Sequence, residues 1–303
     1  MSLVKTLNNK GVIKFGIKLC QLIPQKLAYT LIKPFASFLA SFKETDLIKA
    51  IQANQRIVSG APLSSGKDLR QKTCAVLQHA LICYYDFFHN LDNMEKMAAF
   101  CPTVDQLLEE LTDLTDQKGA LIITPHLSNF NLVFQVMTSK GFKSKLLTLS
   151  SLYSGYGLIN HLRAQVGVDI ISADEGDHSS DLVHHLKSGD LVVTAVDRPI
   201  KVRKSRHRLN FFGYPSDLPA GYISLALAAN VPVIILAVFQ QSDGTYDYHL
   251  KGPIPLKQRN SRVDTILYNA ERILQEIEYF VKKTPEQWLM YYPVWPDLRK
   301  DCQ

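Results

Sequence analysis

The sequence predicts an α/β protein in which a mostly parallel sheet is sandwiched by helices, with a helical N-terminal region. Strand-like runs alternate with helical patterns over most of the chain after Gly119, and most of these runs are predominantly apolar. Alternation is typical of a parallel sheet, because crossover connections that usually contain a helix join parallel strands. Strands without a polar face are typical of a sheet covered on both sides. The length of 303 residues is sufficient for a large core.

The individual elements are predicted from hydrophobic periodicity. Strand-like runs indicate strands over 120–124, 145–149, 168–171, 191–196, 231–239 and 246–250. Amphipathic segments indicate helices over 131–139, 157–166, 179–187 and 221–229, and a last helix over 262–282. We expect the side chain of Ser128 or Asn129 to cap the first of these helices, because a short polar side chain satisfies its free N–H groups.

The first part of the chain is expected to be helical. The pattern indicates helices from residue 45 to about 100, with a break near 59–66, and a short amphipathic helix over 103–114. We therefore divide the chain into a segment 1–43 and a domain 44–303. In that domain the helical part extends to about residue 115 and the α/β part begins at about residue 118.

The segment 1–43 contains seven lysines, many apolar residues and no acidic residue. At helical spacing, one face holds Lys10, Lys14 and Lys18 and another holds Val12, Phe15, Leu19 and Leu22. No run reaches the roughly 18 apolar residues that cross a bilayer, and lysines interrupt the apolar stretch that a signal peptide requires. We expect an amphipathic anchor on an anionic membrane surface. The alternative is a helical hairpin packed on the domain with a solvated lysine face.

Composition excludes several classes of protein. Hydrophobic residues make up 46% and charged residues 20% of the chain, which is typical of a folded protein. The five cysteines form no C-x-x-C pair, so neither a metal site nor a disulfide framework is expected, and a reducing compartment fits best. No glycine-rich nucleotide loop is present. We expect no resident cofactor, no metal and no nucleic acid partner.

His126 is the most informative residue for chemistry. An apolar strand-like run ends at Pro125, His126 follows, and a helical pattern begins a few residues later. The carboxyl end of a strand beside a helix N-terminus is where α/β proteins usually place their reactive groups. An imidazole titrates near neutral pH and is suited to accept a proton from a hydroxyl. A structural histidine at a strand-to-helix turn is the alternative.

Five segments occur in the order found in a known family. They are 126–132 with a His-x4-Asn box, 163–170 with R-x3-G-x2-I, 186–198 with a strand that ends in aspartate, 210–226 with F-F-G-x-P and G-x3-L-A, and 285–288 with P-E-Q-W. Together they resemble the bacterial lipid A late acyltransferases of the lauroyl/myristoyl type and the related phosphatidylinositol mannoside acyltransferases. The resemblance covers roughly residues 50–297.

The resemblance implies a glycerolipid acyltransferase-like fold and transfer of a fatty acyl group from a thioester to a hydroxyl of a membrane lipid or glycolipid. The donor would be acyl carrier protein or CoA. His126 would be the general base, oriented by residue 131. The expected location is the cytoplasmic face of the inner membrane, bound peripherally or monotopically.

Position 131 departs from the family, which has Asp or Glu there, because this chain has Asn131. An amide oxygen accepts the imidazole N–H but supplies no negative charge to the imidazolium. Asp197, at the end of a predicted strand, is the best substitute, and an ion pair with Arg198 is its alternative role. Two further functions therefore stay open: a non-catalytic lipid-binding paralogue, and a hydrolase of acyl thioesters or lipids.

A basic cluster follows Asp197 at residues 201–208. We expect it to bind phosphates of the acyl donor, an acidic carrier protein or anionic lipid, whereas a solvated loop is the alternative. The predicted substrate-binding residues are Arg163, Arg198, Arg203, Lys204, Arg206, Arg208, Phe212 and Gly213. Residues 291–295 are Tyr-Tyr-Pro-Val-Trp where the family usually has a His-Arg-Arg-like stretch, which argues against a multiply phosphorylated acceptor.

Overall fold

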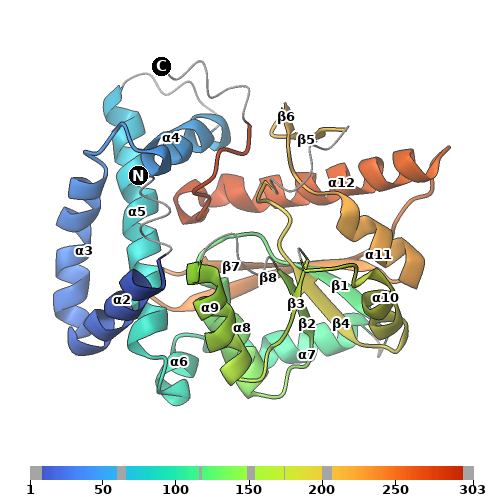
Figure 1. Cartoon of the computed structure of the whole chain (residues 1–303), viewed down its shortest axis with the longest axis horizontal. Helices are drawn as coiled ribbons and strands as arrows, with labels where there is room; N and C mark the ends of the chain where they lie inside the picture. The colour runs from blue at the N-terminus through green and yellow to red at the C-terminus, as the bar shows by residue number, and fades with distance from the viewer. Residues whose placement is uncertain are drawn as a thin grey trace.

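A computed structural model of the chain describes residues 9–59, 66–115, 118–148, 154–173, 175–199 and 207–295. Its N-terminal part, up to Thr115, is helical, as predicted (Figure 1). The helices are α2 (Lys10–Leu22), α3 (Gln25–Leu39), α4 (Asp46–Val58), α5 (Gly66–His89), α6 (Met94–Ala99) and α7 (Val104–Thr115). The long helix α5 is the one on which α2, α3 and α4 pack.

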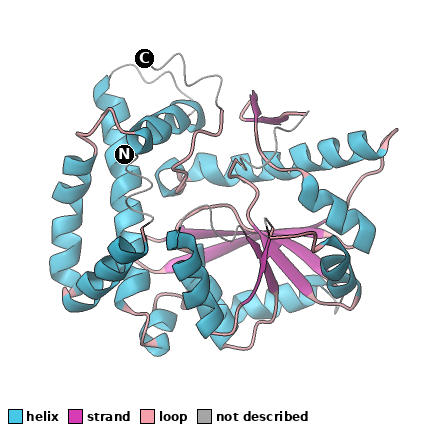
Figure 2. Cartoon of the chain, viewed as in Figure 1, coloured by secondary structure: helices cyan, strands magenta, loops and turns pink. Residues whose placement is uncertain are grey.

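A six-stranded sheet lies at the centre of the α/β part (Figure 2). The spatial order of its strands is β3-β2-β4-β1-β7-β8. Its strands are β1 (Ala120–Ile123), β2 (Lys145–Thr148), β3 (Asp169–Ser172), β4 (Leu191–Thr194), β7 (Val233–Gln240) and β8 (Tyr246–Ile254). Every neighbouring pair is parallel except β7 and β8. The predicted mostly parallel sheet is therefore confirmed.

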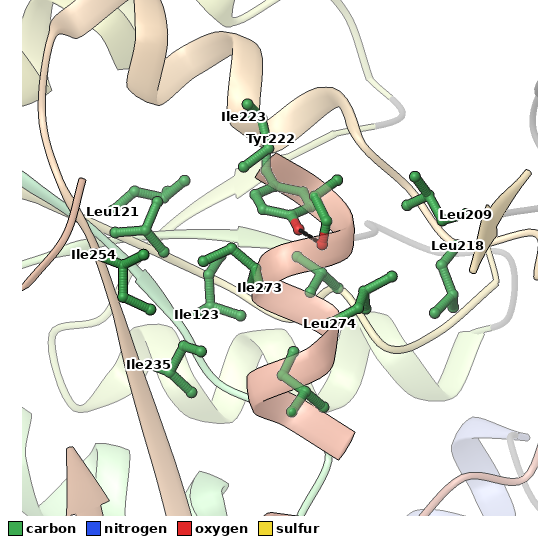
Figure 3. Packing of buried hydrophobic residues seen from close by; sticks show 14 of the residues in the cluster. Leu121, Ile123, Leu209, Leu218, Tyr222, Ile223, Ile235, Ile254, Ile273 and Leu274 are labelled. Atoms are coloured by element: carbon green, nitrogen blue, oxygen red, sulfur yellow. Dashed lines mark hydrogen bonds between the residues drawn. The ribbon is translucent and has the colours of Figure 1, made fainter. Parts of the chain in front are cut away.

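Helices cover both faces of this sheet. They are α8 (Phe130–Ser139), α9 (Ser154–Gln165), α10 (Ser179–Lys187), α11 (Gly221–Ala229) and α12 (Arg262–Lys283). Side chains alternate along β1, so Leu121 and Ile123 pack with α10, α11 and α12, while Ile122 packs on the other face with α7 and α8. Figure 3 shows Leu121, Ile123 and Ile235 against Ile273 of α12. All four side chains are fully buried.

A short hairpin beside α12 was not predicted. Its strands are β5 (Leu209–Phe211) and β6 (Tyr214–Ser216). Phe212 and Gly213 form the turn, with φ of 54° and 79°. Two-residue hairpin turns favour positive φ because they then match the twist of the strands. The Phe-Phe-Gly segment is thus the tip of this hairpin.

One local prediction was wrong. Asn129 occupies the N-cap position of α8, but neither its side chain nor that of Ser128 caps the helix. The Asn129 amide donates instead to the carbonyl oxygen of Cys83 on α5 (2.9 Å). The Ser128 hydroxyl lies 3.0 Å from Nε2 of His79 on α5. The polar side chains of this turn therefore attach it to α5.

The outward faces of α2 and α3 are unusually apolar. On α3 the buried positions are Ala28, Ile32 and Ala36, so small side chains dominate the packed face. The exposed apolar side chains of this segment are larger: Val12, Phe15, Leu19, Leu22, Leu27, Leu31, Phe35, Phe38 and Phe42. Among the helices in the described residues, none is long and apolar enough to span a membrane.

Candidate active site

The sheet register brings His126 and Asp197 together. Strands β1 and β4 are parallel neighbours, and Ile123 pairs with Thr194 at their carboxyl ends. His126 and Asp197 each lie three residues beyond that pair (123 + 3 and 194 + 3). Carboxyl ends of parallel strands share one edge of a sheet, which is where ligands bind in open α/β folds. Two distant segments thus meet because of the fold.

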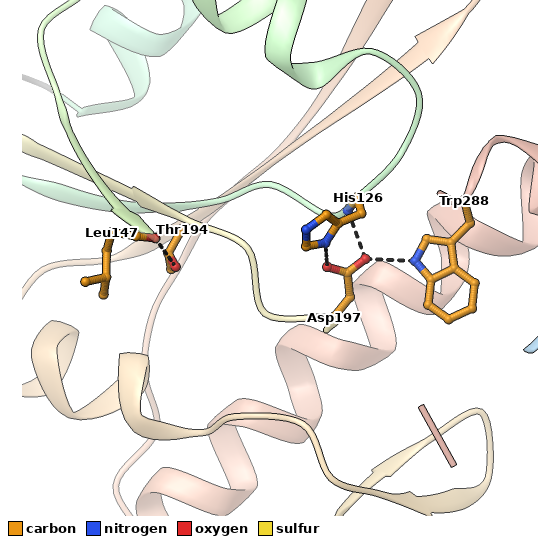
Figure 4. Close-up of polar contacts among 5 residues, drawn as sticks. All are labelled: His126, Leu147, Thr194, Asp197 and Trp288. Carbon is orange, nitrogen blue, oxygen red and sulfur yellow. Dashed lines mark hydrogen bonds and ion pairs between the residues drawn. The ribbon is translucent and has the colours of Figure 1, made fainter. Parts of the chain in front are cut away.

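Asp197 receives three N–H donors. Nδ1 of His126 lies 2.6 Å from Oδ1 of Asp197. The backbone N–H of His126 (2.9 Å) and the indole N–H of Trp288 (2.8 Å) both donate to Oδ2 (Figure 4). A carboxylate accepts but does not donate, so Nδ1 carries the imidazole proton and the lone pair is on Nε2. Asp197 is fully buried, while 22% of the His126 side chain is exposed.

These contacts keep Asp197 ionised. Burial alone would raise its pKa, but the charge attraction of His126 and the hydrogen bonds from His126 and Trp288 outweigh burial and hold the pKa below its ordinary value. A charged carboxylate at Nδ1 stabilises an imidazolium that forms when Nε2 accepts a proton. The pair therefore has the geometry and charge of a general base with its orienting acid.

The segment that follows α12 holds the turn at His126 in place through backbone contacts. The 3-10 helix η1 (Pro285–Gln287) ends beside the His126 turn, and Leu127 and Trp288 form an antiparallel bridge. The backbone N–H of Ser128 donates to Gln287 (2.9 Å), and that of Leu289 donates to His126 (2.8 Å). Sequence reasoning matched residues 285–288 to a motif but gave Trp288 no contact, because nothing in the local sequence indicates where this segment folds back.

Asn131 contacts Arg163 and has no contact with His126 among the hydrogen bonds described. Its Oδ1 accepts from Nε of Arg163 (3.1 Å) and from a terminal guanidinium nitrogen of the same residue. Another guanidinium nitrogen donates to Asn160 (2.8 Å). Asp197, not Asn131, occupies Nδ1 of His126. The structure thus joins two predicted site residues, Asn131 and Arg163, in a contact between α8 and α9.

Among the other predicted substrate-binding residues, the structure describes Arg198, Arg208, Phe212 and Gly213. The Arg198 guanidinium lies 4.2 Å from the ring centroid of Tyr292. Tyr292 belongs to the stretch 291–295, which departs from the family pattern. Arg208 forms an ion pair with Asp217 (3.0 Å). Phe212 packs against Trp295 and Gly213 is exposed in the hairpin turn. Arg203, Lys204 and Arg206 lie outside the described residues.

A buried polar group on α5 supports the His126 turn and was not predicted. His79 contacts Ser128, and burial lowers the pKa of His79 to about 4, so this imidazole is neutral at physiological pH. Asp86, one to two turns further along α5, accepts from Tyr29 of α3 (2.6 Å) and Tyr246 of β8 (2.5 Å). Burial raises the pKa of Asp86 to about 6.

In the part of the chain that the structure describes, no group of three or more potential ligands could hold a metal ion.

The fold and these contacts define an α/β protein that carries a buried carboxylate–histidine pair at the carboxyl edge of its sheet. Within this class, the chain belongs to the bacterial lipid A biosynthesis acyltransferase family, whose sequence model matches residues 12–296. It is thus an acyltransferase of the lipid A type, and the resemblance seen in the sequence motifs is confirmed. No curated protein matches the chain at a significant level.

The contact between Asn131 and Arg163 leads to a first prediction. Asn131→Asp is expected to keep the rate of acyl transfer within about threefold of that of the unaltered protein, because the new carboxylate pairs with Arg163. The pair adds at most about 1 kcal/mol to the free energy of unfolding. Asn131→Leu is expected to lower the free energy of unfolding by about 1 kcal/mol or more, because Arg163 loses an acceptor for two N–H groups. Acyl transfer and thermal unfolding measure both effects.

Asn160→Leu is the matched control, since Asn160 accepts from a different nitrogen of the same guanidinium. We expect it to be less destabilising than Asn131→Leu. If Asn131→Asp lost more than about a hundredfold in rate while its thermal stability rose, residue 131 would act on the reacting groups and not only on Arg163.

Proposed function

We propose that this protein transfers a fatty acyl group from an acyl thioester to a hydroxyl group of a membrane lipid or glycolipid, with His126 as the general base and Asp197 as the carboxylate that orients it. The observation that supports this most is the buried Asp197 on Nδ1 of His126. It leaves Nε2 as the nitrogen that meets a substrate. The family supplies the class of reaction.

In the proposed reaction the acceptor oxygen attacks the thioester carbonyl carbon and gives its proton to Nε2 of His126. A hydroxyl is a weak nucleophile, so its attack requires a base in place. The tetrahedral intermediate then collapses, the carbon–sulfur bond breaks, and the imidazolium returns the proton to the leaving thiolate. Asp197 stays ionised throughout and stabilises the imidazolium. The products are an ester and a free thiol.

The test is an assay with labelled acyl thioester, the purified protein and vesicles of bacterial membrane lipid. Labelled lipid as the product supports the proposal. Labelled free fatty acid would favour the hydrolase, and unchanged thioester would favour a non-catalytic lipid-binding protein. Running the assay with acyl carrier protein and with CoA as the thiol identifies the donor.

The basic cluster at residues 201–208 is proposed to bind the donor's phosphate or an acidic carrier. Its sequence position just after Asp197 and Arg198 is the support for this role. We also propose that substrate is bound by Arg198, Arg208, Phe212 and Gly213. We propose that no resident cofactor takes part, because the chemistry of acyl transfer requires only the thioester, the hydroxyl and a base.

The protein is proposed to act on the cytoplasmic face of the inner membrane and to attach through the outward faces of α2 and α3. Large apolar side chains are exposed there: Phe15 is 68% and Leu22 is 80% exposed. The lysines of α2 and α3 are exposed on the same helices. Apolar side chains that enter the bilayer interface, with lysines that meet anionic headgroups, are typical of an interfacial anchor.

Replacing Phe15, Leu22, Phe35 and Phe38 together by serine is expected to weaken binding to anionic vesicles at least about tenfold. High salt is expected to weaken binding of the unaltered protein, because it screens the lysines. Vesicle sedimentation measures both effects. The matched control replaces Val263 and Tyr279, which are exposed apolar residues of α12, by serine. If the two variants bind anionic vesicles equally well, the outward faces of α2 and α3 are not the membrane anchor.

A further inference from the structure

The buried indole of Trp288 is connected to the candidate base through Asp197. Its N–H donates to Oδ2 of Asp197 at 2.8 Å, and Trp288 is 1% exposed. The same oxygen accepts the backbone N–H of His126, and the other oxygen faces Nδ1. A carboxylate turns about its Cβ–Cγ bond, so the donors at Oδ2 decide where Oδ1 points.

Trp288 is itself held in place on every side. Its backbone forms the bridge with Leu127, and its ring packs against Phe211 and Trp295, with centroids 6.1 and 6.2 Å away. The preceding Gln287 exchanges two hydrogen bonds with the backbone of Gln240 at the end of β7 (2.8 and 3.0 Å). The indole N–H is therefore a fixed donor, with its position set by the sheet.

We propose that Trp288 is a positioning residue of the acyl-transfer site, which orients the Asp197 carboxylate so that Oδ1 holds the imidazole with its proton on Nδ1. This inference rests on the proposed function. Trp288 does not touch the reacting atoms in this arrangement, so its loss changes the rate of the chemical step and leaves the KM for the acyl donor unaltered.

Trp295 is a matched control within the same aromatic group. It is also buried (2% exposed), and its indole N–H donates to the carbonyl oxygen of Phe211 at 2.9 Å. Trp288→Phe and Trp295→Phe each remove one buried indole and one N–H donor. They differ in that Trp288 alone of the two contacts Asp197.

Trp288→Phe is expected to lower kcat about tenfold or more with an unchanged KM, because a hydrogen bond to a charged group is lost. The hydrogen bond from Trp288 lowers the pKa of Asp197, so its removal leaves a more basic carboxylate. The His126–Asp197 pair then keeps its proton to a higher pH, and the acid limb of the pH profile of kcat is expected to move to higher pH. Trp295→Phe is expected to shift neither kcat nor this limb.

If Trp288→Phe does not fold, the pH dependence of the indole N–H resonances of the unaltered protein still tests the inference. The chain has two tryptophans, so the spectrum of Trp295→Phe assigns both indole N–H resonances. The Trp288 resonance is expected to change with pH as the His126–Asp197 pair gains or loses its proton, and to lose this pH dependence in His126→Ala. The Trp295 resonance is expected to stay constant.

Three outcomes separate the inference from the function on which it rests. If His126→Ala is inactive but Trp288→Phe matches Trp295→Phe in kcat and pH profile, the inference is wrong and the proposed function stands. A Trp288 resonance that does not titrate also overturns it. If His126→Ala retains full activity, the proposed base itself is wrong.

Discussion

Replacing His126 by alanine is expected to reduce acyl transfer about a thousandfold or more. The variant leaves the acceptor hydroxyl without a base at the carboxyl edge of β1 and β4. It also leaves Asp197 buried without its largest charge partner, since the contact with Nδ1 is lost. Initial rates of labelled lipid formation, at saturating thioester and vesicles, measure the effect.

His185 offers a matched control, because it also lies against an aspartate. Its Nδ1 is 3.1 Å from Asp190, but it belongs to α10, and Asp190 precedes β4 at the amino end of the strand. His185→Ala is expected to retain the activity of the unaltered protein. Substantial transfer by His126→Ala would mean that another group accepts the proton, and the role assigned to the pair would have to be abandoned.

The helices and strands were predictable because each depends on the pattern of a few neighbouring residues. The strand-like run at 120–124 and the helical pattern at 131–139 each depend on a few neighbouring residues. The structure places β1 and α8 within a residue or so of these bounds. The hairpin around Phe212 and Gly213 was missed, because three-residue strands carry too little periodicity to identify and their turn depends on backbone angles that the sequence does not reveal.

The candidate site was predictable only in part, since its residues are distant in sequence. His126 stands out because it follows an apolar strand, and Asp197 because it ends another. Their contact depends on β1 and β4 being neighbours, which is a property of the sheet order. Trp288 lies 91 residues from Asp197, and no periodicity links the two.

Asn131 illustrates the limit of reading a role from a motif. The family resemblance implied that residue 131, five positions after His126, orients the imidazole. The structure turns its amide towards Arg163 of α9, because helix α8 begins at Phe130 and directs side chains by its own periodicity. A residue five positions from a base is therefore not necessarily its partner.

Asp197→Asn is expected to reduce acyl transfer by a factor on the order of 10⁴, a loss larger than its small change in shape implies. Two N–H groups, from His126 and Trp288, point at Oδ2, and Nδ1 of His126 faces Oδ1. An amide has one oxygen and one NH2 group. Its oxygen is expected to take the Oδ2 position, which has two donors, and its NH2 group then faces the imidazole.

That arrangement selects the wrong tautomer of His126. An NH2 group at Nδ1 requires a lone pair there, so the imidazole proton moves to Nε2, the nitrogen that must accept the proton of the acceptor hydroxyl. We expect kcat to fall while the KM for the thioester changes little, with loss of the imidazole Nδ1–H resonance at neutral pH. Asp190→Asn, at a second His–Asp contact, is the matched control and should retain activity. A fully active Asp197→Asn variant would show that orientation of the imidazole does not depend on this carboxylate.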